Sequence, residues 1–264
     1  MNFLFTLTLL STIASSPPEM IAHRGESFDA PENTLAAFRL AWERKVDAIE
    51  LDVRLTRDGQ LILCHDPDTE RTTGKKLEIK NTDFARLRQL EAGAWKDERW
   101  KGEKLPTLDE ALATIPDRGR CLIEIKVGPE AVPAVAKSIQ ACGKRPDQLA
   151  IISFQADAIA ESKRQLPHLK AYYLAKLKQD KKTGVWTPTV KELIDQAKTI
   201  RADGLDLSYE GPIDAESVKQ IKAAGLEFYV WTVDDETVAR RFADWGADGI
   251  TTNRAAWLRD QLSK

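Results

Sequence analysis

Short apolar runs alternate with amphipathic stretches along most of the chain. Eight runs have the length and composition of strands, and they cover residues 20–23, 48–54, 121–126, 149–154, 171–175, 204–208, 228–232 and 248–251. Between them, apolar residues recur at helical spacing, as in residues 33–43, where Leu35, Phe38 and Trp42 share one face. Strands that alternate with helices indicate parallel βαβ units. The pattern therefore predicts an α/β protein in which eight strands close into a barrel.

One connection departs from this regular alternation. After the second strand, Asp58-Gly59 is a hairpin signal that predicts a further strand over residues 61–64. Residues 66–112 then form a charged stretch that is far longer than an ordinary connection. We interpret residues 66–112 as a small inserted subdomain on the barrel rim, within a single domain that spans residues 17–264.

Length and charge narrow the functional classes. The 264 residues suit one barrel domain, for which about 250 residues are typical. The net charge of -2 gives no electrostatic reason to expect nucleic acid as a partner. No apolar run reaches the roughly 18 residues of a membrane-spanning helix, so no stable membrane anchor is expected. No pattern indicates an oligomeric state.

The N-terminal segment differs from the rest. Residues 1–16 contain no Asp, Glu, Lys or Arg, residues 3–13 are mostly apolar, and Ala14-Ser15-Ser16 offers small side chains for cleavage. This composition resembles a secretory signal peptide and favours export to the periplasm or the medium, although the usual leading Lys or Arg is missing. If the true start lies upstream, or if the segment is only a disordered end, a cytoplasmic location is the alternative.

The cysteines Cys64, Cys121 and Cys142 are odd in number, which leaves at least one free thiol in an exported protein. Cys64 and Cys121 lie in apolar runs, so we expect them to be buried as small hydrophobic side chains. No CxxC pair occurs, so neither a zinc site nor a redox motif is indicated.

Three acidic residues interrupt strands that are otherwise apolar. Side chains alternate across a strand, so Glu50 and Asp52 share one face of their run, and Glu124 lies in another. Three carboxylates at one barrel mouth need a counter-charge, and oxygen ligands suit one divalent cation, Ca²⁺ or Mg²⁺. The alternative is that the acids pair with nearby cations, namely Arg24, Arg54 and Lys126.

His23 ends one strand candidate and His65 directly follows another, both near these acids. Active sites of α/β barrels form at the C-terminal ends of the strands. An unperturbed imidazole titrates near neutral pH, so a pair of histidines can divide the roles of general acid and general base. The third histidine, His168, lies in a short polar connection, and we expect it at the surface.

Motifs of several other enzyme classes are missing. The chain contains no GxSxG, HExxH, Walker or GxGxxG sequence, so nothing indicates a serine nucleophile, a zinc protease, an NTPase or a dinucleotide site. Two histidines, a carboxylate-bound cation, Arg24 and Lys126 suit cleavage of a phosphodiester, because positive charges stabilise the phosphoryl oxygens.

The chain resembles the glycerophosphodiester phosphodiesterase family in several stretches that follow one another in order: AHRG with PENT, ELDVRLTRDGQLILCHD, IEIK, YVWTVDD and GADGITTN. The resemblance runs from Ile21 to Asn253. It implies a TIM (β/α)8 barrel and one Ca²⁺ or Mg²⁺ ion. The matching metal ligands are Glu50, Asp52 and Glu124.

The same resemblance implies roles for further residues. His23 and His65 match the acid–base pair, Arg24 and Lys126 match phosphate-binding positions, and Trp231 matches an aromatic residue near the glycerol site. Residues 66–112 correspond to the inserted subdomain of the family. One departure occurs at Thr252-Asn253, where family members often have Thr-Asp. Asn can cap the following helix as Asp does.

The expected reaction is metal-dependent hydrolysis of small glycerophosphodiesters to sn-glycerol 3-phosphate and an alcohol. The preferred alcohol, the choice between Ca²⁺ and Mg²⁺, the assignment of acid and base, and the attacking group (water or the substrate's own glycerol hydroxyl) stay open. One alternative is a phospholipase-type phosphodiesterase acting on a lipid head group, which an exposed apolar surface at the barrel mouth would favour. The other is a non-catalytic phosphate-ester binding protein, which would require a lost acid–base residue.

A lysine-rich stretch follows the fifth predicted strand. Residues 176–186 contain Lys176, Lys178, Lys181 and Lys182 against a single acid, Asp180. Most charge runs are only solvated surface. A loop that follows a barrel strand lies at the active-site end, however, so these lysines are expected to attract an anionic substrate.

Overall fold

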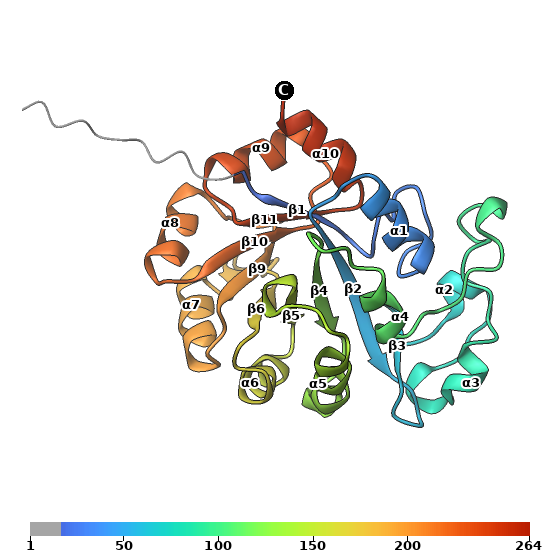
Figure 1. The fold of residues 1–264 in the computed structure, drawn as a ribbon. Helices are drawn as coiled ribbons and strands as arrows, with labels where there is room; N and C mark the ends of the chain where they lie inside the picture. Colours follow the sequence, from blue (N-terminus) through green and yellow to red (C-terminus); the bar gives the residue numbers. More distant parts are fainter. Residues whose placement is uncertain (1–16) are drawn as a thin grey trace, which may run out of the picture.

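The computed structural model describes residues 17–264 and shows a closed barrel (Figure 1). Parallel strands follow one another around the ring in the order β1-β11-β10-β9-β6-β5-β4-β2, and pairing of β1 with β2 closes it. The strands are β1 (Glu19–Ala22), β2 (Ala48–Leu55), β4 (Arg120–Ile125), β5 (Leu149–Ser153), β6 (Lys170–Ala175), β9 (Gly204–Ser208), β10 (Glu227–Trp231) and β11 (Gly249–Thr252). The predicted TIM barrel is confirmed. The signal peptide predicted over residues 1–16 lies outside the described residues.

Helices surround the strands as an outer layer (Figure 1). They are α1 (Leu35–Glu43), α4 (Leu108–Ala113), α5 (Val132–Ala141), α6 (Ala156–Gln165), α7 (Val190–Thr199), α8 (Ala215–Ala223), α9 (Glu236–Asp244) and α10 (Ala255–Leu262). The start of α1 is fixed by Thr34, whose hydroxyl accepts a hydrogen bond from the N–H of Ala37. Phe38, on the predicted apolar face of α1, is fully buried.

Side-chain alternation along the strands separates two apolar clusters. Outward-facing side chains of β2, such as Ile49 and Leu51, are fully buried in the cluster that includes the helices. Each such burial contributes about 1.5–3 kcal/mol. Inward-facing Ala48 belongs to a second cluster inside the barrel. The next inward positions on β2 are Glu50 and Asp52, so the apolar filling gives way to ionisable side chains toward the C-terminal mouth.

The long connection after β2 begins with β3 (Leu61–Leu63), which pairs antiparallel with β2 as the hairpin signal predicts. Short helices follow: α2 (Glu70–Thr73), η1 (Ile79–Asn81), α3 (Phe84–Leu87) and η2 (Glu98–Trp100). This part of the chain lies at the side of the barrel (Figure 1) and has a small apolar cluster of its own around Ile79 and Leu87. Helix α4 begins within the range 66–112 but packs against α1 and α5. The division of the chain into barrel and inserted subdomain stays a prediction.

Smaller features agree with the sequence. Cys64 and Cys121 are buried, and Cys64, Cys121 and Cys142 are all free thiols. The lysine-rich stretch after β6 forms a hairpin of β7 (Lys178–Gln179) and β8 (Trp186–Thr187), which are joined antiparallel. None of the helices in residues 17–264 combines the length and the apolarity that crossing a membrane requires. The remaining short helices are η3 (Pro129–Ala131) and η4 (Pro146–Gln148).

Candidate active site

Inward-facing side chains at the C-terminal ends of the strands surround a cavity of about 190 Å³. Its lining residues are His23, Arg24, Glu50, His65, Glu124, Lys126, Ile152, Phe154, Leu174, Asp206, Trp231, Thr232 and Thr251. Seven of the eight site residues expected from the sequence are in this lining. The eighth, Asp52, is fully buried beside Glu50 and Glu124.

The three carboxylates crowd together in a buried setting. Glu50, Asp52 and Glu124 are 2%, 0% and 7% exposed, and one oxygen from each lies within 4.8 Å of the others. Burial, together with the charges of Asp52 and Glu124, raises the pKa of Glu50 well above its ordinary value. Burial and Asp52 raise the pKa of Glu124 to about 7. Without another positive charge, these acids resist ionising together.

Two cations partly neutralise the acids. Lys126 Nζ lies 2.7 Å from Glu124 Oε1 and 3.3 Å from Asp52 Oδ1. Arg24 Nε lies 3.3 Å from Asp52 Oδ2, although its Nη1 donates to Glu32 Oε1 at 2.8 Å. Burial alone would raise the pKa of Asp52, but Lys126 and Arg24 hold it well below its ordinary value. The pairing alternative is therefore correct for these two cations.

The third expected partner, Arg54, turns away from the acids. Its Nε and Nη2 donate to the backbone carbonyl of His65 at 3.1 and 2.6 Å. Two cations thus face three carboxylates, and Glu50 Oε1 has no hydrogen-bond partner within residues 17–264. An orphaned carboxylate oxygen beside two further carboxylates fits a hard divalent cation, because such an ion supplies the missing positive charge.

Arg24 is positioned by an unusual backbone turn. Its φ of 57° and the φ of 82° at Gly25 both lie in the left-handed region. This turn directs the N–H of Arg24 to Glu50 Oε2 at 2.9 Å. A Cβ at Gly25 would lie 2.6 Å from Ala37 Cβ, so the turn requires glycine. The sequence His23-Arg24-Gly25 therefore forms one structural unit.

A neutral amide holds His23. Asn253 Nδ2 donates to Asp234 Oδ2 at 2.6 Å, which leaves its Oδ1 to accept a hydrogen bond from His23 Nδ1 at 2.8 Å. Nε2 is then the imidazole nitrogen that can accept a proton. Burial, with the charge of Arg24, lowers the pKa of His23 to about 4. The expectation that Asn253 caps α10 is wrong, because Arg254 is the N-cap residue and the amide serves His23.

A carboxylate holds His65. Its Nδ1 lies 2.8 Å from Asp66 Oδ1, and Arg71 Nε donates to Asp66 Oδ2 at 2.6 Å. Burial lowers the pKa of His65, while Asp52 and Asp66 act in the opposite direction. The His65 side chain is 34% exposed, and His23 is also only partly buried. His168 is exposed, as expected.

Sequence reasoning missed three polar or charged residues of this region. Asn33 Nδ2 donates to Asp52 Oδ2 at 2.7 Å and its Oδ1 accepts the N–H of Asp52 at 3.0 Å, so it orients that carboxylate. Arg71 reaches Glu32 from the long connection with contacts of 2.6 and 2.8 Å. Asp206 lines the cavity from β9. The PENT motif contained the signal for Asn33, and the acid in an apolar strand was the signal for Asp206. Arg71 had none.

Trp231 contributes an aromatic wall, next to a residue that sequence reasoning did not name. Its ring meets Phe154 edge-to-face with centroids 5.5 Å apart. Its Nε1 donates to the backbone carbonyl of Asp206 at 3.1 Å, which fixes the orientation of the indole.

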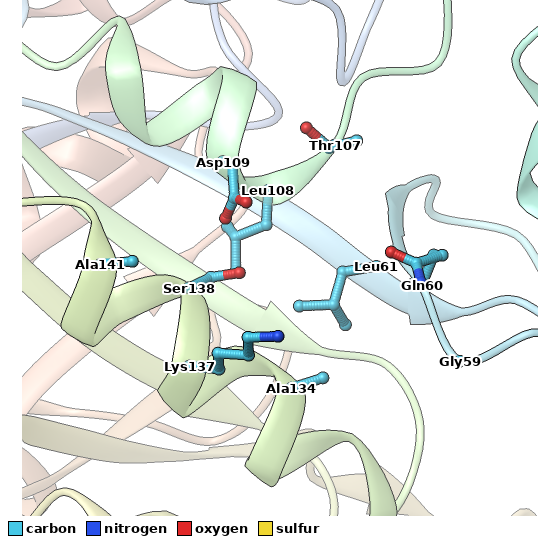
Figure 2. A pocket seen from close by; sticks show the side chains of 10 residues that line it. All are labelled: Gly59, Gln60, Leu61, Thr107, Leu108, Asp109, Ala134, Lys137, Ser138 and Ala141. Carbon is cyan, nitrogen blue, oxygen red and sulfur yellow. The ribbon is translucent and has the colours of Figure 1, made fainter.

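A second cavity, of about 230 Å³, lies between the start of β3, the start of α4 and one face of α5 (Figure 2). Its charged lining residues are Asp109 and Lys137, and it shares no residue with the cavity at the barrel mouth. No histidine is among its lining residues. The ionisable groups that suit catalysis therefore gather at the mouth.

Similarity to known proteins covers nearly the whole chain. Residues 23–256 match the model of the glycerophosphoryl diester phosphodiesterase family. A glycerophosphodiester phosphodiesterase of Caldanaerobacter subterraneus subsp. tengcongensis is 34% identical over 249 residues, which cover 93% of this chain and 98% of that protein. One of Bacillus subtilis is 31% identical, over 88% of this chain and 82% of that protein. A solved phosphodiesterase of Oleispira antarctica, in complex with the product sn-glycerol-3-phosphate, has a TM-score of 0.84 at 28% identity and covers 94% of this chain and 98% of its own.

Proposed function

Because the chain belongs to the glycerophosphoryl diester phosphodiesterase family, we propose that it hydrolyses small glycerophosphodiesters with one bound divalent cation and two histidines as acid and base. Glycerophosphodiester phosphodiesterase activity itself follows from the family. The finer proposal rests mainly on one observation, the meeting of three buried carboxylates and two histidines at one cavity. The product named for the Oleispira antarctica relative supports sn-glycerol 3-phosphate as the product here.

Glu50, Asp52 and Glu124 would hold the ion, Ca²⁺ or Mg²⁺. A divalent cation at this position supplies charge stabilisation to the phosphoryl oxygens as the transition state forms. Arg24 and Lys126 face the same cavity and would bind the remaining phosphate oxygens through charge-assisted hydrogen bonds.

The environments of the two histidines support different roles. His23 has an amide partner and a pKa lowered to about 4, so it is neutral near pH 7 and suits the general base. Burial lowers the pKa of His65 as well, but Asp66 Oδ1 lies 2.8 Å from its Nδ1 and stabilises the imidazolium when it forms, so His65 suits the general acid better than His23 does. In this proposal, His23 Nε2 takes the proton of the attacking hydroxyl, a bond forms from that oxygen to phosphorus, the bond to the leaving alcohol breaks, and His65 returns a proton to that alcohol.

A turnover assay tests the proposal. We expect release of sn-glycerol 3-phosphate from glycerophosphocholine, glycerophosphoethanolamine and glycerophosphoglycerol, loss of release in EDTA, and recovery with Ca²⁺ or Mg²⁺. Full turnover in excess chelator by a metal-free preparation would contradict the metal assignment. Trapping of a cyclic glycerophosphate intermediate would identify the substrate hydroxyl as the attacker, whereas incorporation of labelled water without that intermediate would identify water.

One observation favours a second candidate, hydrolysis at a lipid head group. The large hydrophobic side chains exposed within residues 17–264 are Phe28, Trp95, Phe154, Val185 and Trp257, and all lie in segments that follow a barrel strand. Arg254 stacks on Trp257 at 3.8 Å and lies 5.6 Å from the ring of Phe28. Exposed aromatic and basic residues of this kind suit a membrane interface.

Vesicles containing lysophosphatidylcholine test this candidate. If lipid is the substrate, the double variant Phe28→Ser, Trp257→Ser should lose vesicle hydrolysis and keep turnover of soluble glycerophosphocholine. No hydrolysis of the vesicle substrate by the wild-type protein would eliminate it.

Export is proposed on the composition of residues 1–16 alone. N-terminal sequencing of the protein from the periplasm or medium of an expressing bacterium should find a start near residue 17. Recovery of the uncleaved chain from the cytoplasm alone would contradict export.

A further inference from the structure

Asp206 is a buried carboxylic acid that the proposed mechanism does not use. Its side chain is 1% exposed and lines the cavity from the inward face of β9. Oδ1 has no hydrogen-bond partner within residues 17–264. A buried polar group without a partner costs about 1–3 kcal/mol, so a partner is expected from whatever fills the cavity.

The surroundings of Asp206 indicate what that partner is. Parallel pairing sets Asp206 level with Leu174 on β6, and Ile152 and Trp231 are further lining residues from β5 and β10. This wall is apolar apart from Asp206. The residues that would hold metal and phosphate come instead from β1, β2 and β4 and the segments that directly follow them. A diester bound by its phosphate on the charged side would extend one arm toward the apolar wall.

A glycerol arm fits this wall better than the other arms available. Its C–H groups can pack on the indole of Trp231, while its hydroxyls need hydrogen-bond partners. Burial, with the charge of Glu124, raises the pKa of Asp206 well above its ordinary value. A hydroxyl can donate the hydrogen bond that Oδ1 lacks, whereas a quaternary ammonium group has no N–H or O–H to donate.

We propose that Asp206 hydrogen-bonds a hydroxyl of the glycerol arm and thereby makes this enzyme select glycerol esters over plain alkyl esters of phosphate. The inference rests on the proposed function for the orientation of the substrate. It assigns Asp206 a role in specificity and leaves the proton transfers to the histidines.

Product binding tests the assignment without turnover. Two probes are used with the metal-loaded protein in a calorimeter: sn-glycerol 3-phosphate and n-propyl phosphate, which lacks both hydroxyls. We expect the wild-type protein to prefer sn-glycerol 3-phosphate by about 10- to 100-fold, the value of one or two hydrogen bonds in a buried site. Asp206→Leu should reduce that preference to less than about threefold, and Asp206→Asn, which can still donate and accept, should restore most of it.

Ile152→Val is the matched control, because it trims the same wall without changing its polarity and should keep the wild-type preference. Affinity for n-propyl phosphate reports whether each variant is folded, and Asp206→Ala replaces the leucine variant if that one does not fold. A wild-type protein without preference, or a leucine or alanine variant that keeps it, would overturn the assignment. Preference in binding together with no turnover of any glycerophosphodiester would refute the proposed function and leave Asp206 as a glycerol-selecting residue.

Discussion

The two ends of the barrel use similar side chains in opposite ways. At the N-terminal end, Arg120 Nη1 lies 2.6 Å from Glu19 Oε2, and its Nη2 donates to Tyr172 OH at 2.9 Å. Tyr172 OH donates in turn to Glu227 Oε2 at 2.7 Å, and Lys170 Nζ lies 3.0 Å from Glu227 Oε1. Each charged group of this network thus has a partner of opposite charge.

At the C-terminal mouth the charges do not balance. Three carboxylates lie within 4.8 Å of one another, and Glu50 Oε1 and Asp206 Oδ1 lack hydrogen bonds within the described chain. One end of the barrel therefore satisfies its own polar groups, and the other holds groups that a ligand must satisfy. Unsatisfied groups lower stability until the ligand binds, which is the usual compromise at a functional site.

The largest effect is expected from Glu50→Gln. Removing a ligand charge should weaken metal binding and lower turnover by about 10³-fold or more at limiting metal, because several kcal/mol of charge stabilisation are lost. In the metal-free protein, the same substitution should raise stability. The pKa of Glu50 is raised in the fold above its ordinary 4.5, so its ionisation removes stability as pH rises above 4.5. A glutamine side chain does not ionise, so the variant does not lose stability in this way.

Thermal unfolding in EDTA checks the second half of this prediction. The variant should have a higher Tm than the wild-type protein at pH 8, and the difference should be smaller at pH 5. Saturating Ca²⁺ or Mg²⁺ should reverse the order. An equal Tm for both proteins at both pH values would mean that the carboxylates do not repel one another.

The two histidines test whether catalysis takes place at the C-terminal mouth. His23→Ala and His65→Ala should each lower the rate by about 10²–10⁴, and the double variant should lose less than the product of the two. A diester with a nitrophenol leaving group should partly rescue His65→Ala and not His23→Ala, because such a leaving group needs no acid. Rescue of His23→Ala instead would exchange the assigned roles, and full activity in both variants would reject the mechanism.

Removing an ion pair at the N-terminal end of the barrel should lower stability and leave catalysis unchanged. Arg120→Met removes the cation that faces Glu19 and should lower the free energy of unfolding by about 3 kcal/mol, the low end for a broken buried pair. The low end applies because the side chains of Arg120 and Glu19 are 19% and 18% exposed, so the pair is only partly buried. Urea unfolding measures the loss, kcat should stay within about twofold, and Glu19→Gln added to Arg120→Met should recover part of the stability. A fall in kcat as large as in the histidine variants would remove the distinction between the ends.

The fold was predictable because its signals are local. Period-2 alternation and helical spacing recur along the chain, so each strand could be located within a residue or two, and the same alternation predicted that Glu50, Asp52 and Glu124 face inward. The signal for α4 was local too, but it was hidden at the end of a long irregular stretch.

The site was less predictable because its supporting contacts join distant residues. Arg71 meets Glu32 across 39 positions, and Asn253 meets His23 across 230. No periodicity encodes such pairs. The orphaned oxygen of Asp206 is likewise a property of what surrounds it, which sequence alone does not list.

A smaller effect is expected from exchanging the partners of His23. Asn253→Asp combined with Asp234→Asn keeps the net charge and the hydrogen bond between the two positions, but moves the carboxylate next to the imidazole. An adjacent opposite charge raises a histidine pKa by about 1–2 units, so the acidic limb of kcat/KM should move to higher pH by that amount. Ser27→Ala, which loses only a 3.1 Å hydrogen bond to Asn253 Oδ1, is the control. An unmoved limb would mean that His23 is not the group titrating there.

The smallest effect is expected from charges that act at a distance. Lys178, Lys181 and Lys182 are exposed on the hairpin after β6, at the mouth end, whereas Lys176 already pairs with Glu210. Replacing the three exposed lysines by Gln should lower kcat/KM for an anionic diester by about three- to tenfold at low salt and leave kcat unchanged, because they speed capture without touching the substrate. Exposed charges are screened over about 8–10 Å near physiological salt, so the difference should vanish as ionic strength rises.

The matched control is the triple Gln variant of Lys45, Lys198 and Lys264, which lie in or just after the last turns of barrel helices, near the opposite end of the barrel. Parallel salt curves for the two triple variants would show that the hairpin lysines are ordinary solvated surface, and a steeper curve for the hairpin variant alone would show that the mouth attracts its substrate before binding it.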